Sequence, residues 1–158
     1  MPTHKYTRLD LSSVKSSEDK LVPYLTATLG KQNPYSKLVI FLGEAHNSKV
    51  DQNTARRVLG RLPLWPANAT VILERGLEDV YEPHVPPGVG IGRENSPEGD
   101  SMQARNERLA RMIIDKFEGA AKVAVYVACG SEHGPAVFKI LDRRYHGDFT
   151  FIFKPSVV

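Results

Sequence analysis

Residues 38–46 read LVIFLGEAH, and this stretch decides the fold. Its first five residues form a continuous apolar run, which is typical of a strand buried on both faces of a parallel sheet. Similar runs, rich in valine or isoleucine, occupy residues 71–73 and 123–128. A fourth run, residues 149–153, alternates phenylalanine with threonine and isoleucine, and we expect it at an edge of the sheet.

Helical patterns separate these runs. Apolar residues recur at helical spacing over residues 50–62 and again over residues 109–117. Ser101 or Asp100 is placed to cap the start of the second of these helices. Further helices are expected at residues 135–144 and 18–29. The alternation predicts an α/β fold: a mainly parallel sheet with helices on both faces and a site at the carboxyl ends of the strands.

The composition is that of one globular domain, which we expect to span residues 1–158. The formal net charge of +3 comes from acidic and basic residues that are mixed along the chain, so nucleic acid is not an expected partner. Prolines and glycines crowd residues 83–99 and disfavour regular structure. We therefore expect a flexible flap at about residues 80–100.

The sequence as given shows neither the apolar run of a signal peptide nor a stretch long enough for a membrane helix. We expect a cytoplasmic protein, or a secreted or delivered one if the domain belongs to a larger effector. The single cysteine, Cys129, excludes an intramolecular disulfide and a four-cysteine zinc site. Because Cys129 lies in an apolar run, we interpret it as a packed small hydrophobe.

Polar residues follow three of the apolar runs. Glu44 and His46 follow the first in the motif Gly-x-x-His, and Glu74 follows the second. His133 follows the third, in a second Gly-x-x-His motif. Since parallel strands end at one edge of the sheet, we expect these four side chains to form a functional site.

Two histidines and a carboxylate suit a divalent metal such as zinc, manganese, iron or cobalt, which activates a bound water. Without a metal, a histidine and a carboxylate can activate water directly. Glu44 and Glu74 are then the candidates for ligand and base. Arg75 and Arg105 are the cations best placed to bind a substrate carboxylate, and Asn106 lies beside Arg105 at the start of a helix.

A structural explanation competes with this functional one. His46 and His133 can be turn histidines, and Glu44 and Glu132 can favour the start of the helices that follow them. The spacing of Arg105, Arg108 and Arg111 is more often that of a solvated helix face. The two equivalent Gly-x-x-His motifs favour a functional site.

Four motifs in this order carry a family resemblance: FLGEAH at 41–46, VILER at 71–75, RNERLA at 105–110 and CGSEH at 129–133. The chain resembles the superfamily that joins TraB/TIKI proteins, erythromycin esterases and ChaN-like haem-binding proteins. Likeness to the TIKI-type metalloproteases implies roles for His46, His133, Glu74 and Arg105. Likeness to the esterases implies Glu44 or Glu74 as the base, and likeness to the ChaN-like members implies haem as an alternative cofactor.

The chain departs from this superfamily in lacking the extra helices that build the substrate pocket of larger members. Its compact form resembles the terminal effector module of a bacterial toxin. The leading hypothesis is a hydrolase that cleaves an amide or ester bond in a peptide, ester or other small-molecule substrate. The rival hypotheses are a haem- or metal-binding protein without turnover and an interaction domain without chemistry.

Overall fold

The fold is built on one parallel sheet of six strands, in the order β1-β6-β2-β5-β3-β4. The computed structural model describes residues 3–9, 20–27, 37–62 and 68–157. The strands are β1 His4–Arg8, β2 Lys37–Glu44, β3 Asn68–Leu73, β4 Gly90–Arg93, β5 Val123–Gly130 and β6 Phe149–Lys154. The prediction of an α/β fold with a parallel sheet is confirmed.

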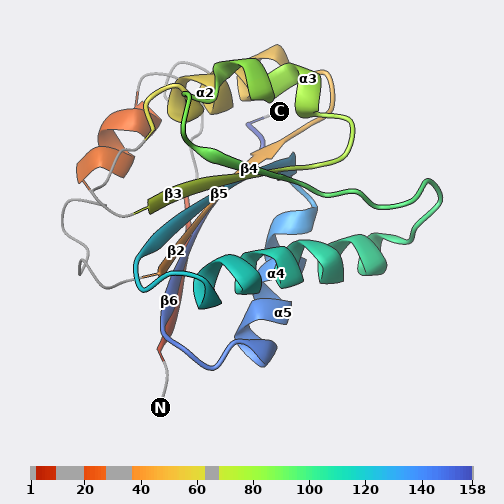
Figure 1. Ribbon diagram of the computed structural model, residues 1–158. Helices are drawn as coiled ribbons and strands as arrows, with labels where there is room; N and C mark the ends of the chain where they lie inside the picture. The colour runs from red at the N-terminus through yellow and green to blue at the C-terminus, as the bar shows by residue number, and fades with distance from the viewer. Residues whose placement is uncertain (1–2, 10–19, 28–36, 63–67, 158) are drawn as a thin grey trace.

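Helices cover both faces of the sheet (Figure 1). They are α2 Lys49–Leu59, α3 Glu78–Tyr81, the short 3-10 helix η1 Glu82–His84, α4 Met102–Glu118 and α5 His133–Arg144. Residues 20–27 are also helical, whereas the remainder of the helix predicted at residues 18–29 lies outside the described residues. Helices α2 and α3 lie on one face, and α4 and α5 lie on the other.

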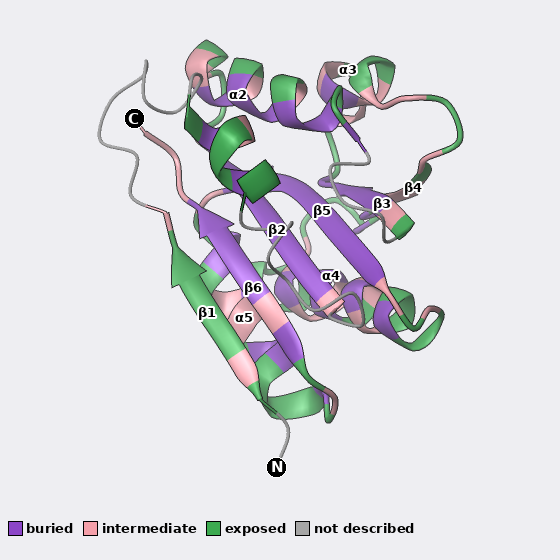
Figure 2. Ribbon diagram, turned by 90° about the vertical axis from the view of Figure 1, so that its left-hand side faces the viewer, coloured by how far each residue is buried: buried purple, intermediate pink, exposed green. Residues whose placement is uncertain are grey.

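The core consists of two apolar layers, one on each face. In β2, Leu38, Ile40 and Leu42 pack toward the layer that includes α2. Val39 and Phe41 pack toward the layer of α4 and α5. The central strands are therefore buried on both sides, as Figure 2 shows for β2, β5 and β6, which explains their continuous apolar sequences.

Serine residues cap α2 and α4 at their first turns. The Ser48 side chain accepts a hydrogen bond from the Asp51 amide at the start of α2, and Ser101 accepts one from the Ala104 amide at the start of α4. Each serine satisfies a backbone amide that has no partner within its helix. Of the two caps predicted for α4, Ser101 is the one that forms.

The prediction that residues 149–153 form an edge strand is wrong. Strand β6 lies between β1 and β2, with His4 opposite Phe149 in the register of β1. Most of β1 is exposed, so its sequence lacks the apolar pattern of a buried strand. His4 helps to hold it, because its ring nitrogens lie 2.8 Å from Asp142 Oδ1 and 2.8 Å from the Gly147 carbonyl oxygen.

The expectation of irregular structure throughout residues 83–99 is also wrong. This segment contains the end of η1 and the whole of β4, which pairs in parallel with β3. Glycine suits β4 because a Cβ atom at Gly92 would lie 3.2 Å from Met112 Cε in α4. The flexibility of the flap stays a prediction.

Among the described residues, no helix combines the length and apolar character needed to cross a membrane.

Candidate functional site

Acidic side chains gather at the carboxyl edge of the sheet. Glu44 is the last residue of β2, while Glu74 and Glu94 directly follow β3 and β4. All three are almost completely buried. Burying a carboxylate is unfavourable unless hydrogen bonds or cations compensate for its lost hydration, so each of them needs identified partners.

Glu74 is held by donors on both of its carboxylate oxygens. The Gly130 amide donates to Oε1 at 2.6 Å, and Arg105 Nη2 donates to Oε2 at 2.7 Å. Burial alone would raise the pKa of Glu74, but these donors, together with Cys129, lower it below its ordinary value. Glu74 is therefore a fixed negative charge at the end of β3.

Arg105 joins Glu74 to a second carboxylate, Glu94. Arg105 Nε donates to Glu94 Oε1 at 3.0 Å, and the Ser96 amide donates to Glu94 Oε2 at 3.1 Å. The two carboxylates raise the pKa of Arg105 although burial opposes this shift. Sequence reasoning missed Glu94 because it follows β4, the strand hidden among prolines and glycines. The guanidinium thus bridges two protein carboxylates through its Nε and Nη2 atoms.

His133 is the first residue of α5 and is buried. Its Nδ1 lies 2.5 Å from Asn106 Oδ1 in α4, and its Nε2 lies 3.8 Å from Glu74 Oε2. With the amide oxygen of Asn106 as acceptor, Nδ1 carries the hydrogen and Nε2 keeps its lone pair. Burial lowers the pKa of His133, although the charge of Glu74 opposes the shift, and the lowered pKa favours this neutral form. A lone pair and a carboxylate oxygen therefore face each other across 3.8 Å.

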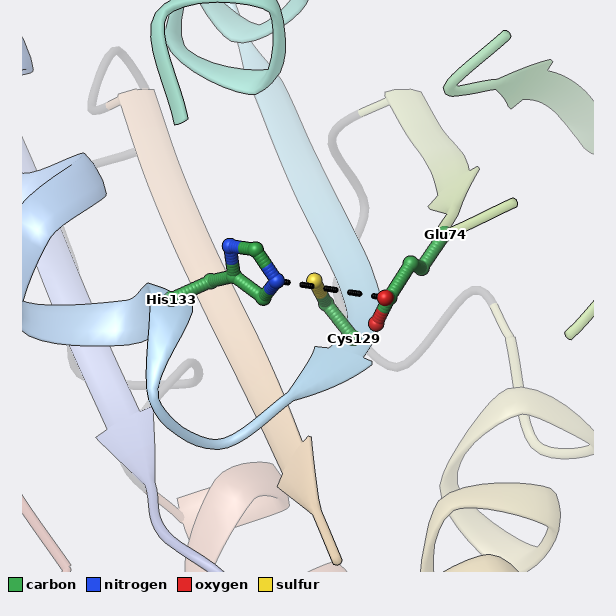
Figure 3. Close-up of side chains that lie close together, drawn as sticks. All are labelled: Glu74, Cys129 and His133. Carbon is green, nitrogen blue, oxygen red and sulfur yellow. Dashed lines mark ion pairs between the residues drawn. The ribbon is translucent and has the colours of Figure 1, made fainter. Parts of the chain in front are cut away.

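Cys129 completes a cluster with these two residues. One ligand atom from each of Glu74, Cys129 and His133 lies within 4.8 Å of the others, and all three residues are buried. Figure 3 shows the sulfur beside the line that joins the His133 ring to the Glu74 carboxylate. Burial, reinforced by Glu74, raises the pKa of the Cys129 thiol well above its ordinary value. This group of carboxylate, thiol and imidazole could hold a metal ion.

Glu44 occupies a separate environment, on the side of the sheet where Leu42 and Tyr81 pack. The Tyr81 hydroxyl donates to Glu44 Oε1 at 2.8 Å, and Gln52 Nε2 lies 3.5 Å from Oε2. Burial raises the pKa of Glu44, although the hydrogen bond from Tyr81 opposes the shift. Glu44 pairs in the sheet register with Gly130, whose amide binds Glu74. Glu44 and the donor of Glu74 are thus neighbours across the backbones of β2 and β5.

The remaining sequence candidates lie outside the cluster of Glu74, Cys129 and His133. His46 is exposed in the loop after β2, next to Asn47, whose φ is 68°. Arg75 is exposed, and its Nη1 donates to the Ser96 carbonyl oxygen at 2.9 Å. Arg75 therefore anchors the segment that follows β4.

A groove of about 690 Å³ is lined by residues of α4 and α5. Its lining includes Met102, Asn106 and Ile140. Asn106 therefore contacts both this groove and the His133 ring. Molecules that bind in the groove would lie close to the residue that orients His133.

No protein-family model matches this chain, and comparisons with curated proteins and with solved structures give no significant match.

Proposed function

We propose that this protein is a metal-dependent hydrolase of amide or ester bonds, with its centre at Glu74, Cys129 and His133. The observation that carries the proposal is the facing pair of His133 Nε2 and Glu74 Oε2, which lie 3.8 Å apart beside the Cys129 sulfur. Two electron-pair donors that face each other in a buried place favour a cation between them. The carboxyl edge of a parallel sheet is also where such folds bind ligands.

The donor set fits a zinc-like cation. Thiolate, imidazole and carboxylate are all common zinc ligands, and three protein ligands leave a coordination position for water or substrate. Asn106 supplies the hydrogen bond that orients a ligating imidazole. Binding would require the Cys129 thiol to lose its proton and Glu74 Oε2 to turn from Arg105 toward the cation. A bound cation would supply polarisation of the scissile carbonyl and acidify water.

Glu44 is the residue that we assign to proton transfer. It accepts a proton from water as the water oxygen attacks the carbonyl carbon, and it passes the proton to the leaving nitrogen or oxygen as that bond breaks. The products are then a carboxylic acid and an amine or an alcohol. Support for this role comes from the burial of Glu44, which raises its pKa, from its hydrogen bond to Tyr81, and from its place opposite Gly130 in the sheet register.

The test is hydrolysis of p-nitrophenyl acetate and of a mixture of unstructured peptides, with zinc removed by chelation and then restored. We expect Glu44→Gln, Glu74→Gln and His133→Gln each to lower kcat/KM by at least about 100-fold. Two exposed residues provide the matched controls, Glu98→Gln and His146→Gln, and should keep full activity. Equal activity in the site variants and the controls would refute the assignment.

A second candidate function is metal binding without turnover, which the same three-residue cluster favours. It predicts one zinc per chain, lost in Cys129→Ser and His133→Gln, with no hydrolysis of either substrate. Haem binding stays a prediction from the family resemblance. A Soret band that appears on haem titration and disappears in His46→Ala would support it.

A further inference from the structure

A buried ion pair joins α2 to the end of β6. Lys154 Nζ lies 3.2 Å from Asp51 Oδ1, and the two residues are 2% and 1% exposed. The two charges come from residues about a hundred positions apart in the chain. Burial lowers the pKa of Lys154. Burial would raise the pKa of Asp51, but the hydrogen bonds that Asp51 accepts outweigh this effect, so the pKa of Asp51 is also lowered.

The ion pair binds the backbone on both sides of Glu44. Lys154 Nζ donates to the Gly43 carbonyl oxygen at 3.3 Å, and the Ala45 amide donates to Asp51 Oδ2 at 2.9 Å. Gly43 permits the close approach of β6, because a Cβ atom there would lie 2.8 Å from the Lys154 carbonyl oxygen. The position of Glu44 is therefore fixed through its two neighbours.

The segment after β6 adds donors to the same carboxylate. Ser156 Oγ lies 2.5 Å from Asp51 Oδ2, and the Val157 amide donates to Asp51 Oδ1 at 3.1 Å. The Ser156 amide also donates to Ser131 Oγ at 2.9 Å. Ser131 belongs to the loop between Gly130 and His133, and its own amide donates to the Glu44 carbonyl oxygen at 2.8 Å. This network connects the loops that follow β2, β5 and β6.

Stability alone does not explain such a network. Replacing a buried ion pair by apolar residues of similar volume is often neutral or stabilising, because both charges lose their hydration on burial. Buried polar groups with complete partners instead fix one arrangement of the chain. Asp51 accepts hydrogen bonds from two separate segments, at Ala45 after β2 and at Lys154, Ser156 and Val157 at the end of the chain's last strand and just after it.

We propose that Asp51 and Lys154 are positioning residues for Glu44: their ion pair holds the adjacent peptide groups so that the Glu44 carboxyl keeps its hydrogen bond to Tyr81. The inference rests on the proposed function for its catalytic consequence. Its structural content, the placing of Glu44, can be measured without a substrate. A displacement of about 1 Å in a catalytic group lowers turnover by about 100-fold.

The first readout is the NMR signal of the Tyr81 ring carbon that bears the hydroxyl, with Glu44→Gln as the reference for a changed hydrogen bond. In Asp51→Asn/Lys154→Met, which removes both charges together, the signal should move toward the reference. The matched control is Glu107→Gln/Arg144→Met, which neutralises the 2.6 Å ion pair between α4 and α5 and should leave the signal in place. Should the first double variant not fold, Ser156→Ala removes one donor to Asp51 and should move the signal the same way.

The second readout is turnover. The neutral double variant should lose about tenfold to 100-fold in kcat with little change in KM, and Lys154→Arg, which keeps charge and donor, should restore most of it. An unmoved Tyr81 signal in the Asp51 and Ser156 variants would overturn the positioning role whether or not the protein hydrolyses anything. A moved signal without hydrolysis by any variant would leave the positioning role intact and refute the hydrolase proposal.

Discussion

Asn106 and His133 come from different helices, and their side chains meet at 2.5 Å between Oδ1 and Nδ1. This contact decides which imidazole nitrogen carries the hydrogen and therefore leaves the lone pair of Nε2 facing Glu74. The start of α4 thus controls the chemistry of a residue at the start of α5. Orienting contacts of this kind commonly matter nearly as much as the ligands themselves.

Replacing Asn106 by alanine tests this relationship. We expect Asn106→Ala to weaken zinc affinity by about 10-fold to 100-fold, because the imidazole loses its orienting partner. The free energy of unfolding should fall by about 1–3 kcal/mol, because Nδ1–H stays buried without an acceptor. Calorimetric zinc titration and urea unfolding measure the two effects. Gln103→Ala, an exposed change on the same helix, is the control and should leave both values unchanged.

Two buried tyrosines give a matched comparison. The Tyr81 hydroxyl binds Glu44, whereas the Tyr126 hydroxyl has no hydrogen-bond partner among the described residues. Tyr81→Phe should lower the free energy of unfolding by about 1–3 kcal/mol and raise the pKa of Glu44 further. Tyr126→Phe should be neutral or stabilising, because it removes a buried polar group without a partner. If urea unfolding gave the same loss of unfolding free energy for both variants, that result would contradict the hydrogen bond from Tyr81 to Glu44.

Ionised Asp51 makes the free energy of unfolding fall as pH falls in the acid range. The pKa of Asp51 in the folded state lies below its ordinary value of 3.8. As pH falls, Asp51 therefore takes up its proton at a higher pH in the unfolded chain than in the folded one. The stabilisation by ionised Asp51 is therefore present above about pH 3.8 and is lost as pH falls through the folded-state pKa. Unfolding free energies measured across the acid range should fall less steeply in Asp51→Asn. An unchanged slope would contradict this contribution.

Gly134 follows His133 and lies against the Phe153 ring, which a Cβ atom would overlap. Gly134→Ala should lower the free energy of unfolding by about 1–3 kcal/mol through overpacking. At Gly90 a Cβ atom would lie 3.6 Å from Thr70 Oγ1, an ordinary contact. Gly90→Ala should therefore be tolerated. Thermal unfolding of the two variants checks the difference, and a larger loss at Gly90 would argue against the packing around α5.

The central strands and the long helices could be predicted because burial on both faces leaves continuous apolar runs, as in β2 and β5. Strands β1 and β4 could not. Most of β1 is exposed, and β4 has two glycines in four residues. Both are edge strands of the sheet. Their strand conformation depends on backbone pairing with a neighbouring strand more than on an apolar pattern in their own side chains.

Part of the candidate cluster could be predicted because polar residues follow apolar runs, which singled out Glu74 and His133. Cys129 was missed because it is the last side chain before Gly130 in an apolar run, where packing is the usual role of a small thiol. Its proximity to Glu74 depends on the pairing of β3 with β5, which no local pattern encodes. The same holds for Tyr81, which reaches Glu44 from a four-residue helix.

Cobalt titration of the purified protein tests the central claim most directly, because Co²⁺ replaces Zn²⁺ in such sites and a cobalt–thiolate bond gives a strong near-ultraviolet band. We predict one Co²⁺ per chain with this band, the loss of the band in Cys129→Ser, and its loss with weakened binding in His133→Gln. His46→Ala should keep the band. Two results would contradict a metal centre at Glu74, Cys129 and His133. One is Co²⁺ binding that gives no thiolate band and is lost in His46→Ala, and the other is no Co²⁺ binding at all.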